Sequence, residues 1–213
     1  MDAIKIEARN KVNEIWILVH GVESNALGME ALRGAMYESD DFPFETCRVK
    51  VHRYYRFPVV CALIKSFKEA YSDALYYYIK TQYLKYPNLK KLNIIAHSWG
   101  TFLICNAVRK FTNLYLEKLV MLGGVLPQNT SIYLPRAANV INFTGSSDKV
   151  VLAAGLFKGY GLSGRLGLQT EWRGTDGRLI AYAKKIKNIK TDWNHTDYAK
   201  QENIKEIIKK LKD

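Results

Sequence analysis

Three residue types that cooperate in nucleophilic catalysis occur far apart in this chain, each after a stretch that is typical of a β-strand. Ser98 follows the apolar run 92–96, Asp148 follows the run 137–145, and His195 stands in a loop late in the chain. A serine hydroxyl is a weak nucleophile unless a base removes its proton as it attacks a carbonyl carbon. That base needs a carboxylate to hold its tautomer. These types predict a nucleophile, an acid and a base in the order Ser, Asp, His.

The chain has four histidines, and their positions distinguish them. His195 lies in the loop after the last expected strand, where a base can reach Ser98. His20, His52 and His97 lie within or at the end of strands, where we expect hydrogen-bonded structural histidines. The alternative for His195 is a loop histidine without a partner.

The acid has two competitors close to the base in the chain. Asp192 and Asp197 flank His195, but side chains so near in sequence seldom bend back to hold a ring edge. They more often cap a turn or a helix. The stretch after the strand at 116–124 offers no acid at all. These observations favour Asp148.

The elements that must position these residues alternate along the chain. Apolar or alternating runs predict strands, and apolar residues at helical spacing predict helices. The predicted strands are 14–20, 47–55, 91–97, 116–124, 137–145 and about 180–189; the predicted helices are 61–86, 100–111 and one from about 199. Strands interleaved with helices predict an α/β fold with a mainly parallel central sheet and helices on both faces. The strand at 47–55 alternates, which places it nearer an edge. The carboxyl ends of such strands carry the chemistry.

The segment Ala96-His97-Ser98-Trp99-Gly100 resembles the nucleophile elbow of the α/β-hydrolases of the lipase and esterase type. That elbow reads G-x-S-x-G between a strand and a helix, and the family's catalytic residues follow in the order Ser, Asp, His. Here alanine, another small residue, replaces the first glycine. The resemblance spans residues 14–200 and implies an α/β-hydrolase fold, with residues 1–213 as a single domain.

The resemblance also implies where the oxyanion of a tetrahedral intermediate is held. The donors are the backbone N–H groups of Trp99, directly after the nucleophile, and of Val22, directly after His20-Gly21. Gly21 would let the backbone approach closely; its alternative is a plain strand-to-loop turn.

The substrate is expected to meet a site that is open or covered by loops, because only about a dozen residues separate the strands at 116–124 and 137–145, which leaves no room for a large cap domain. The glycine-rich stretch 152–174 is either a mobile flap or a tightly turned connection. Candidate substrate-binding residues are His20 beside the oxyanion loop and, in that stretch, Leu156, Phe157 and Tyr160.

The composition and charge of the chain limit the classes of partner that it is expected to bind. The chain has 213 residues, 48% of them hydrophobic, with a formal net charge of +12. Much of the excess charge lies in 183–190 and 204–213, where lysines alternate with apolar residues as on a solvated face. A weak contact with anionic surfaces is an alternative role for this charge. The sequence contains no nucleic-acid-binding motif, so no nucleic-acid partner is expected. Three dispersed cysteines predict reduced thiols and no zinc site.

No motif for a metal or nucleotide occurs, so no cofactor is expected. The apolar run 15–19 is too short for a signal peptide or a transmembrane segment, which predicts a cytoplasmic protein. The predicted activity is that of a serine hydrolase cleaving a small-molecule acyl ester or thioester through an acyl-enzyme. The alternative is a non-catalytic protein of the same fold that binds an anionic partner through its basic surface.

Overall fold

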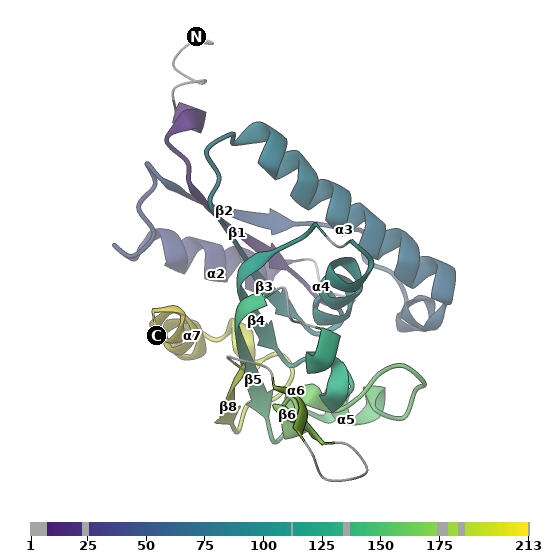
Figure 1. Ribbon diagram of the computed structural model, residues 1–213. Helices are drawn as coiled ribbons and strands as arrows, with labels where there is room; N and C mark the ends of the chain where they lie inside the picture. The colour runs from purple at the N-terminus through teal and green to yellow at the C-terminus, as the bar shows by residue number, and fades with distance from the viewer. Residues whose placement is uncertain are drawn as a thin grey trace.

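A six-stranded parallel sheet runs through the computed structural model, which describes residues 8–22, 26–111, 113–133, 137–173, 179–182 and 186–212 (Figure 1). Its strand order is β2-β1-β3-β4-β5-β8, and every neighbouring pair is parallel. The strands are β1 (Glu14–Val19), β2 (Cys47–His52), β3 (Lys91–His97), β4 (Leu116–Leu122), β5 (Ala137–Gly145) and β8 (Ile186–Thr191). The predicted edge position of the second strand is confirmed.

Helices cover both faces of the sheet (Figure 1). On one face lie α2 (Leu27–Tyr37) and α7 (Gln201–Leu211), and on the other lie α3 (Lys65–Lys85) and α4 (Trp99–Lys110). The chain therefore has the three-layer α/β architecture that the alternation of elements predicted.

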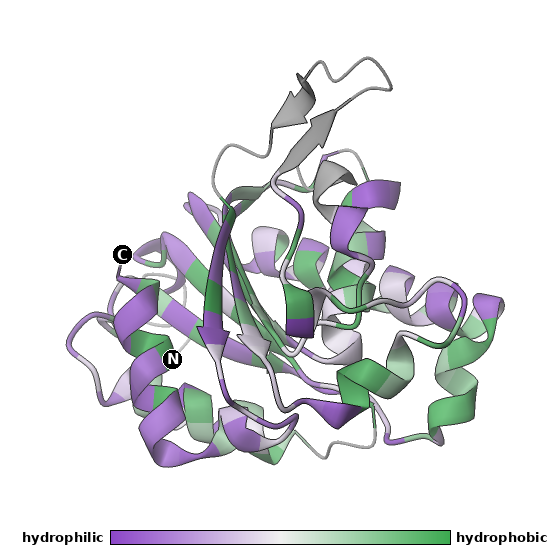
Figure 2. Ribbon diagram, turned by 90° about the horizontal axis from the view of Figure 1, so that it is seen from below, coloured by the Kyte–Doolittle hydropathy of each residue, from purple (hydrophilic) through white to green (hydrophobic). Residues whose placement is uncertain are grey.

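Strand β1 shows why its residues are apolar at consecutive positions. Ile15, Ile17 and Val19 pack into the core beneath α3 and α4, while Trp16 and Leu18 pack into the core beneath α2 and α7. Successive side chains of a strand point to opposite faces, so a strand that is covered on both faces needs no polar side. In Figure 2 the central strands carry hydrophobic colours between the two helical layers.

Helix α7 divides its residues between core and solvent. Ile204, Ile207 and Leu211 are buried, while Lys205 and Lys209 are exposed. The spacing of the apolar residues matches one face of a helix. Lys205 and Lys209 therefore lie on a solvated face of the helix, as the alternation predicted.

The order of the strands determines where a site can form. From β1 the chain continues to β2 on one side, whereas β3 lies on the other side of β1. The loops after β1 and β3 therefore leave the sheet in opposite directions, and a crevice opens between them at the carboxyl ends. His20 follows β1 and Ser98 follows β3.

Several elements differ from the prediction. Helix α2 was not predicted, although Met29, Leu32 and Met36 have helical spacing and are buried. The long helix expected at 61–86 is preceded by the short 3-10 helix η1 (Val59–Leu63), and Ile64 is extended between η1 and α3. The strand expected near 180–189 is two strands, β7 (Leu179–Tyr182) and β8, which belong to different sheets.

The glycine-rich stretch contains short elements. These are α5 (Lys149–Ala154), α6 (Ser163–Leu166) and β6 (Glu171–Arg173), which pairs antiparallel with β7. Between β4 and β5 the described residues include the 3-10 helix η2 (Gln128–Tyr133), and 3-10 helix η3 (Asp197–Ala199) precedes α7. The segment 123–136 is too short for a large cap domain. No helix in the described part of the chain combines the length and apolar character needed to cross a bilayer.

Candidate active site

Ser98 stands in a strained backbone conformation between β3 and α4. Its φ is 53° and its ψ is −125°, a backbone conformation that residues other than glycine rarely adopt. The Ser98 N–H donates to the carbonyl oxygen of Leu122 on β4 at 2.9 Å, which ties the turn to the neighbouring strand. This sharp turn projects the side chain beyond the sheet, as the elbow motif requires.

Gly100 allows α4 to cross closely over β1. A Cβ atom at this position would lie 2.7 Å from the carbonyl oxygen of Val19 and 2.8 Å from that of His20. Both atoms belong to the backbone and cannot rotate away. The second glycine of the elbow motif therefore has a steric reason in this chain.

The Gly100→Ala variant is expected to unfold at lower denaturant concentration, with a loss of about 2–3 kcal/mol, because the added methyl group forces α4 away from β1. Gly34→Ala is the matched control. Gly34 is exposed within α2, and a Cβ atom added there would meet no other atom within 4 Å, so alanine should stabilise the helix by about 0.5–1 kcal/mol. Urea unfolding of both variants measures the difference, and equal effects would contradict the steric account.

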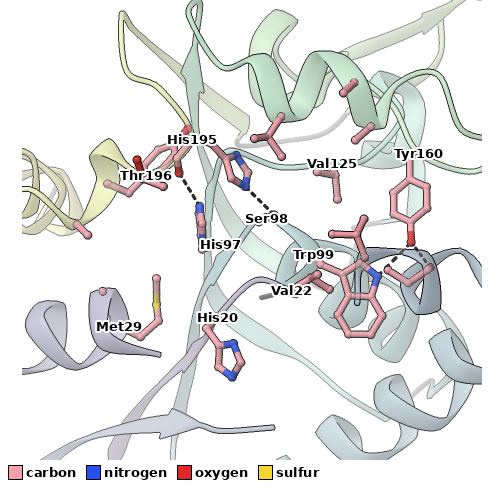
Figure 3. A pocket seen from close by; sticks show the side chains of 18 of the residues that line it. His20, Val22, Met29, His97, Ser98, Trp99, Val125, Tyr160, His195 and Thr196 are labelled. Carbon is pink, nitrogen blue, oxygen red and sulfur yellow. Dashed lines mark hydrogen bonds between the residues drawn. The ribbon is translucent and has the colours of Figure 1, made fainter. Parts of the chain in front are cut away.

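A continuous chain of hydrogen bonds joins Ser98, His195 and Asp148. Figure 3 shows its link between His195 and Ser98. His195 Nε2 lies 2.8 Å from Ser98 Oγ, and His195 Nδ1 lies 2.8 Å from Asp148 Oδ2. When His195 Nδ1–H donates a hydrogen bond to the carboxylate, Nε2 is left as an acceptor for the serine hydroxyl. The fold brings together the three residues that stand at separate strand ends in the sequence.

Asp148 is completely buried, and both of its carboxylate oxygens have partners. Oδ1 accepts the backbone N–H of Val151 at 2.9 Å at the start of α5, while Oδ2 faces His195. The competing Asp197 instead accepts the backbone N–H of Asn194 at 2.8 Å and pairs with Lys200 at 2.9 Å. It caps the turn in which His195 lies, as expected from its position.

Two backbone N–H groups near Ser98 have no partner among the described residues. They belong to Val22, in the loop after β1, and to Trp99, the first residue of α4. Both residues line the same cavity as Ser98 (Figure 3). The first N–H groups of a helix have no intrahelical acceptor and are available to an anion. Gly21 lies against the nucleophile, because a Cβ there would be 2.8 Å from Ser98 Cβ.

Among the histidines other than His195, His20 and His52 are buried and His97 is partly buried, and two of the three form hydrogen bonds to the backbone. His97 Nε2–H donates to the carbonyl oxygen of His195 at 2.9 Å and thereby supports the loop of the base. His20 accepts the Tyr54 N–H at Nε2 and lies 2.8 Å from the Gly21 carbonyl oxygen at Nδ1. Burial lowers the pKa of His52 to about 4 and that of His97 to about 3, and it also lowers the pKa of His20.

These lowered pKa values predict a protein that loses stability in mild acid. Below about pH 6.5 the unfolded chain binds protons at His52 and His97 that the folded chain does not bind. The unfolding free energy therefore decreases as the pH is lowered. Each of the two residues is expected to cost about 2 kcal/mol between pH 6.5 and pH 5. The loss should begin near pH 6.5 and continue towards pH 4.

Urea unfolding at a series of pH values measures this dependence. A His52→Gln variant removes one of the two groups and should show a visibly smaller slope over the same pH range, because it has one less histidine to protonate on unfolding. The account is wrong if the unfolding free energy is flat between pH 6.5 and pH 5 in the unmodified protein.

A cavity of about 570 Å³ opens beside Ser98 and His195. Its walls are mostly apolar. The candidate substrate-binding residues His20, Phe157 and Tyr160 line it. Leu156 does not line it and is 85% exposed. The volume lies within the usual range for sites that bind small molecules.

Sequence reasoning missed one wall of this cavity. Helix α2 contributes Gly28, Met29 and Leu32, and the region after His195 contributes Tyr198 and Ala199. The helical spacing of Met29 and Leu32 could have revealed the helix. Nothing in the sequence could have placed that helix beside Ser98, since its approach depends on the crossing between β1 and β2.

The stretch that follows Asp148 is a tightly hydrogen-bonded connection. Tyr160 Oη accepts from Trp99 Nε1 at 3.1 Å and donates to the Ala62 carbonyl oxygen. The backbone N–H groups of Gly161 and Ser163 donate to carbonyl oxygens in the loop after β4. The second alternative for this stretch, a turned connection, describes residues 152–173, and residue 174 lies outside the described residues.

The side chains that commonly bind metal ions are dispersed. The described residues contain no cluster of three or more histidine, cysteine, aspartate or glutamate side chains that could hold an ion. All three cysteines are free, and burial raises the pKa values of the Cys47 and Cys105 thiols to about 12. These two thiols are therefore protonated at neutral pH.

Comparison with solved structures places this architecture among the α/β-hydrolases. A chain described with LipS and LipT, two metagenome-derived lipolytic enzymes, is 9% identical, with a TM-score of 0.62 over 94% of this chain and 92% of that chain. A SOBER1 variant from Arabidopsis thaliana is 13% identical, with a TM-score of 0.57 over 94% of this chain and 98% of that chain. A "putative hydrolase of the alpha/beta superfamily" from Xanthomonas campestris is 14% identical, with a TM-score of 0.53 over 93% of this chain and 98% of that chain. At such identities the likeness establishes the fold.

The sequence itself matches the family described as "Putative serine esterase (DUF676)" over residues 9–131, more than half of the chain. This protein belongs to that family, and the resemblance to the α/β-hydrolases is confirmed. The match includes the loop after β1 and the elbow at Ser98, but ends before Asp148 and His195. No curated protein sequence matches the chain.

Proposed function

We propose that this protein is a serine hydrolase that cleaves a carboxylic ester or thioester through an acyl-enzyme on Ser98. The observation that carries the proposal is the unbroken set of hydrogen bonds from Ser98 Oγ through His195 to the buried carboxylate of Asp148, at the wall of an apolar cavity. Membership of a serine esterase family supports the same activity.

In the first half of the reaction, His195 Nε2 takes the Ser98 proton while Oγ attacks the carbonyl carbon. Asp148 stabilises the positive charge that forms on the imidazole. The N–H groups of Val22 and Trp99 donate to the oxyanion of the tetrahedral intermediate. When the intermediate collapses, the bond to the leaving group breaks, and His195 gives its proton to the departing alkoxide or thiolate.

In the second half, water attacks the acyl-enzyme. His195 now takes a proton from water, the resulting hydroxide oxygen bonds to the acyl carbon, and the second tetrahedral intermediate forms at the same donors. Its collapse breaks the bond to Ser98 Oγ, which recovers the proton from His195. The products are a carboxylic acid and an alcohol or thiol, and the enzyme returns to its starting state.

The cavity favours a substrate with an apolar acyl or alcohol portion. Phe157, Val150 and Ala154 form an apolar wall from α5 and the residues after it, and Met29 and Leu32 form another from α2. Burying a methylene group from water contributes about 0.8 kcal/mol. We expect kcat/KM to rise with chain length until the chain fills this space.

Intact-mass analysis after treatment with a fluorophosphonate tests the proposal. Such a reagent modifies an activated serine and leaves an ordinary one unmodified. One adduct is expected on the unmodified protein, none on Ser98→Ala, and slower formation on His195→Ala. Absence of any adduct on the folded, unmodified protein would contradict the proposal and favour a non-catalytic member of the fold.

A further inference from the structure

Exposed apolar side chains gather on two segments beside the cavity. Among the described residues, fifteen large hydrophobic side chains are exposed, and seven of them lie in η1 with its next residue or in α5 with the turn after it. We call these seven residues the mouth surface: Val59, Val60, Ile64, Val150, Leu152, Leu156 and Phe157. Isolated exposed apolar residues are ordinary, but a cluster of this size marks an interaction site.

The mouth surface continues into the cavity. Val59, Val150 and Phe157 line the cavity, yet they are also 51%, 51% and 47% exposed. They therefore form the boundary between the cavity and solvent. Val60, Ile64 and Leu156 belong to the same two segments, do not line the cavity, and are 63%, 50% and 85% exposed.

The two segments are held together by a buried tyrosine. Tyr160 is 9% exposed, its hydroxyl donates to the carbonyl oxygen of Ala62 in η1, and its ring also lines the cavity. The apolar area is thus built from two elements in a defined relative position around one opening.

Basic side chains outnumber acidic ones in each segment taken together with the residues next to it in the chain. Residues 53–68 contain four basic side chains and no acidic one, and residues 149–167 contain three basic side chains and no acidic one. Arg56, Lys149 and Lys158 are exposed, and none of them pairs with an acid in the described part of the chain. Lys65 has only a long contact, 3.9 Å, with Glu69.

We propose that the mouth surface docks on an anionic lipid bilayer, so that the active site takes its ester substrate directly from the membrane. Exposed apolar side chains can enter the boundary between headgroups and acyl chains, while lysine and arginine at their edges meet anionic headgroups. A soluble protein partner would explain the apolar area, but the absence of acids from both segments favours a surface that is negative over its whole extent. The part of this proposal that names the membrane as the source of substrate rests on the proposed hydrolase activity. The docking of the mouth surface on a bilayer does not depend on that activity.

Flotation with lipid vesicles tests the docking without catalysis, by using the Ser98→Ala protein. The vesicles contain either phosphatidylcholine alone or phosphatidylcholine with phosphatidylglycerol. We expect the protein to bind vesicles that contain phosphatidylglycerol and to bind little to vesicles of phosphatidylcholine alone. Added salt should weaken the binding. Equal binding to both kinds, or binding to neither, would overturn the proposal.

Two triple variants in the Ser98→Ala background locate the surface. Arg56→Gln/Lys65→Gln/Lys158→Gln removes three charges and should weaken vesicle binding by about 10²-fold. Val60→Ser/Ile64→Ser/Leu156→Ser should weaken it by on the order of 10-fold, because less apolar area enters the bilayer. Thermal unfolding of each variant shows whether it is folded.

Matched controls come from the opposite end of the sheet, near the amino end of β3. Lys85→Gln/Lys90→Gln/Lys91→Gln removes the same charge, and Leu84→Ser removes an apolar side chain that is 78% exposed. Both controls should bind vesicles like the parent. If the charge control weakens binding as much as the mouth variant, general net charge is responsible and the proposed surface is wrong. Fluorophosphonate labelling of the serine-containing protein reports on catalysis separately.

Discussion

Replacing Ser98 with alanine is expected to lower kcat for a water-soluble short-chain ester by about 10⁴- to 10⁶-fold. The hydroxyl is the proposed attacking group, and no other serine lies within hydrogen-bond distance of His195 among the described residues. The KM value should change little, since the apolar walls of the cavity remain. Steady-state kinetics with purified protein measure both quantities.

Ser66→Ala is the matched control for this experiment. Ser66 lies exposed in the first turn of α3, so the same atom is removed without touching the cavity. Its kcat should stay within a factor of two or three of the parent's, as for most surface substitutions. If Ser98→Ala keeps more than a tenth of the parent's kcat, an acyl-enzyme on Ser98 is not the route of hydrolysis.

The second large effect is expected for Asp148→Asn, which should lower kcat by about 10⁴-fold. In the folded protein, Asp148 Oδ1 accepts the Val151 N–H and Oδ2 faces His195 Nδ1. An asparagine has a single side-chain oxygen, and the Val151 N–H requires it. The amide NH₂ then faces Nδ1, so His195 carries its proton on Nε2 and cannot accept the one from Ser98.

This prediction separates the buried acid from its neighbours in the chain. Asp197→Asn is the control, because Asp197 belongs to the same loop as His195 but bonds to Asn194 and Lys200. We expect its kcat to fall less than 10-fold, since only the support of the turn is weakened. Fluorophosphonate labelling of Asp148→Asn should also be slow. Comparable losses of kcat in the two variants would contradict the assignment of the acid.

The central strands and the elbow could be predicted from local patterns. The runs 91–97 and 137–145 coincide with β3 and β5, because strands buried on both faces need consecutive apolar residues. The elements near the opening were predicted less well. Helix α2 and the break at Ile64 depend on packing against other elements, which an amphipathic pattern does not specify.

By itself, the sequence determined the residue types at the strand ends and their order, and with them the α/β-hydrolase class. It did so because parallel strands deliver their carboxyl ends to one edge of a sheet. The sequence favoured Asp148 over Asp197, but only the tertiary structure brings Asp148 to 2.8 Å from His195 and decides that α2, η1 and α5 surround the cavity. These contacts join residues distant in the chain, and their geometry is set by how helices pack on a twisted sheet, which no local pattern of residues encodes.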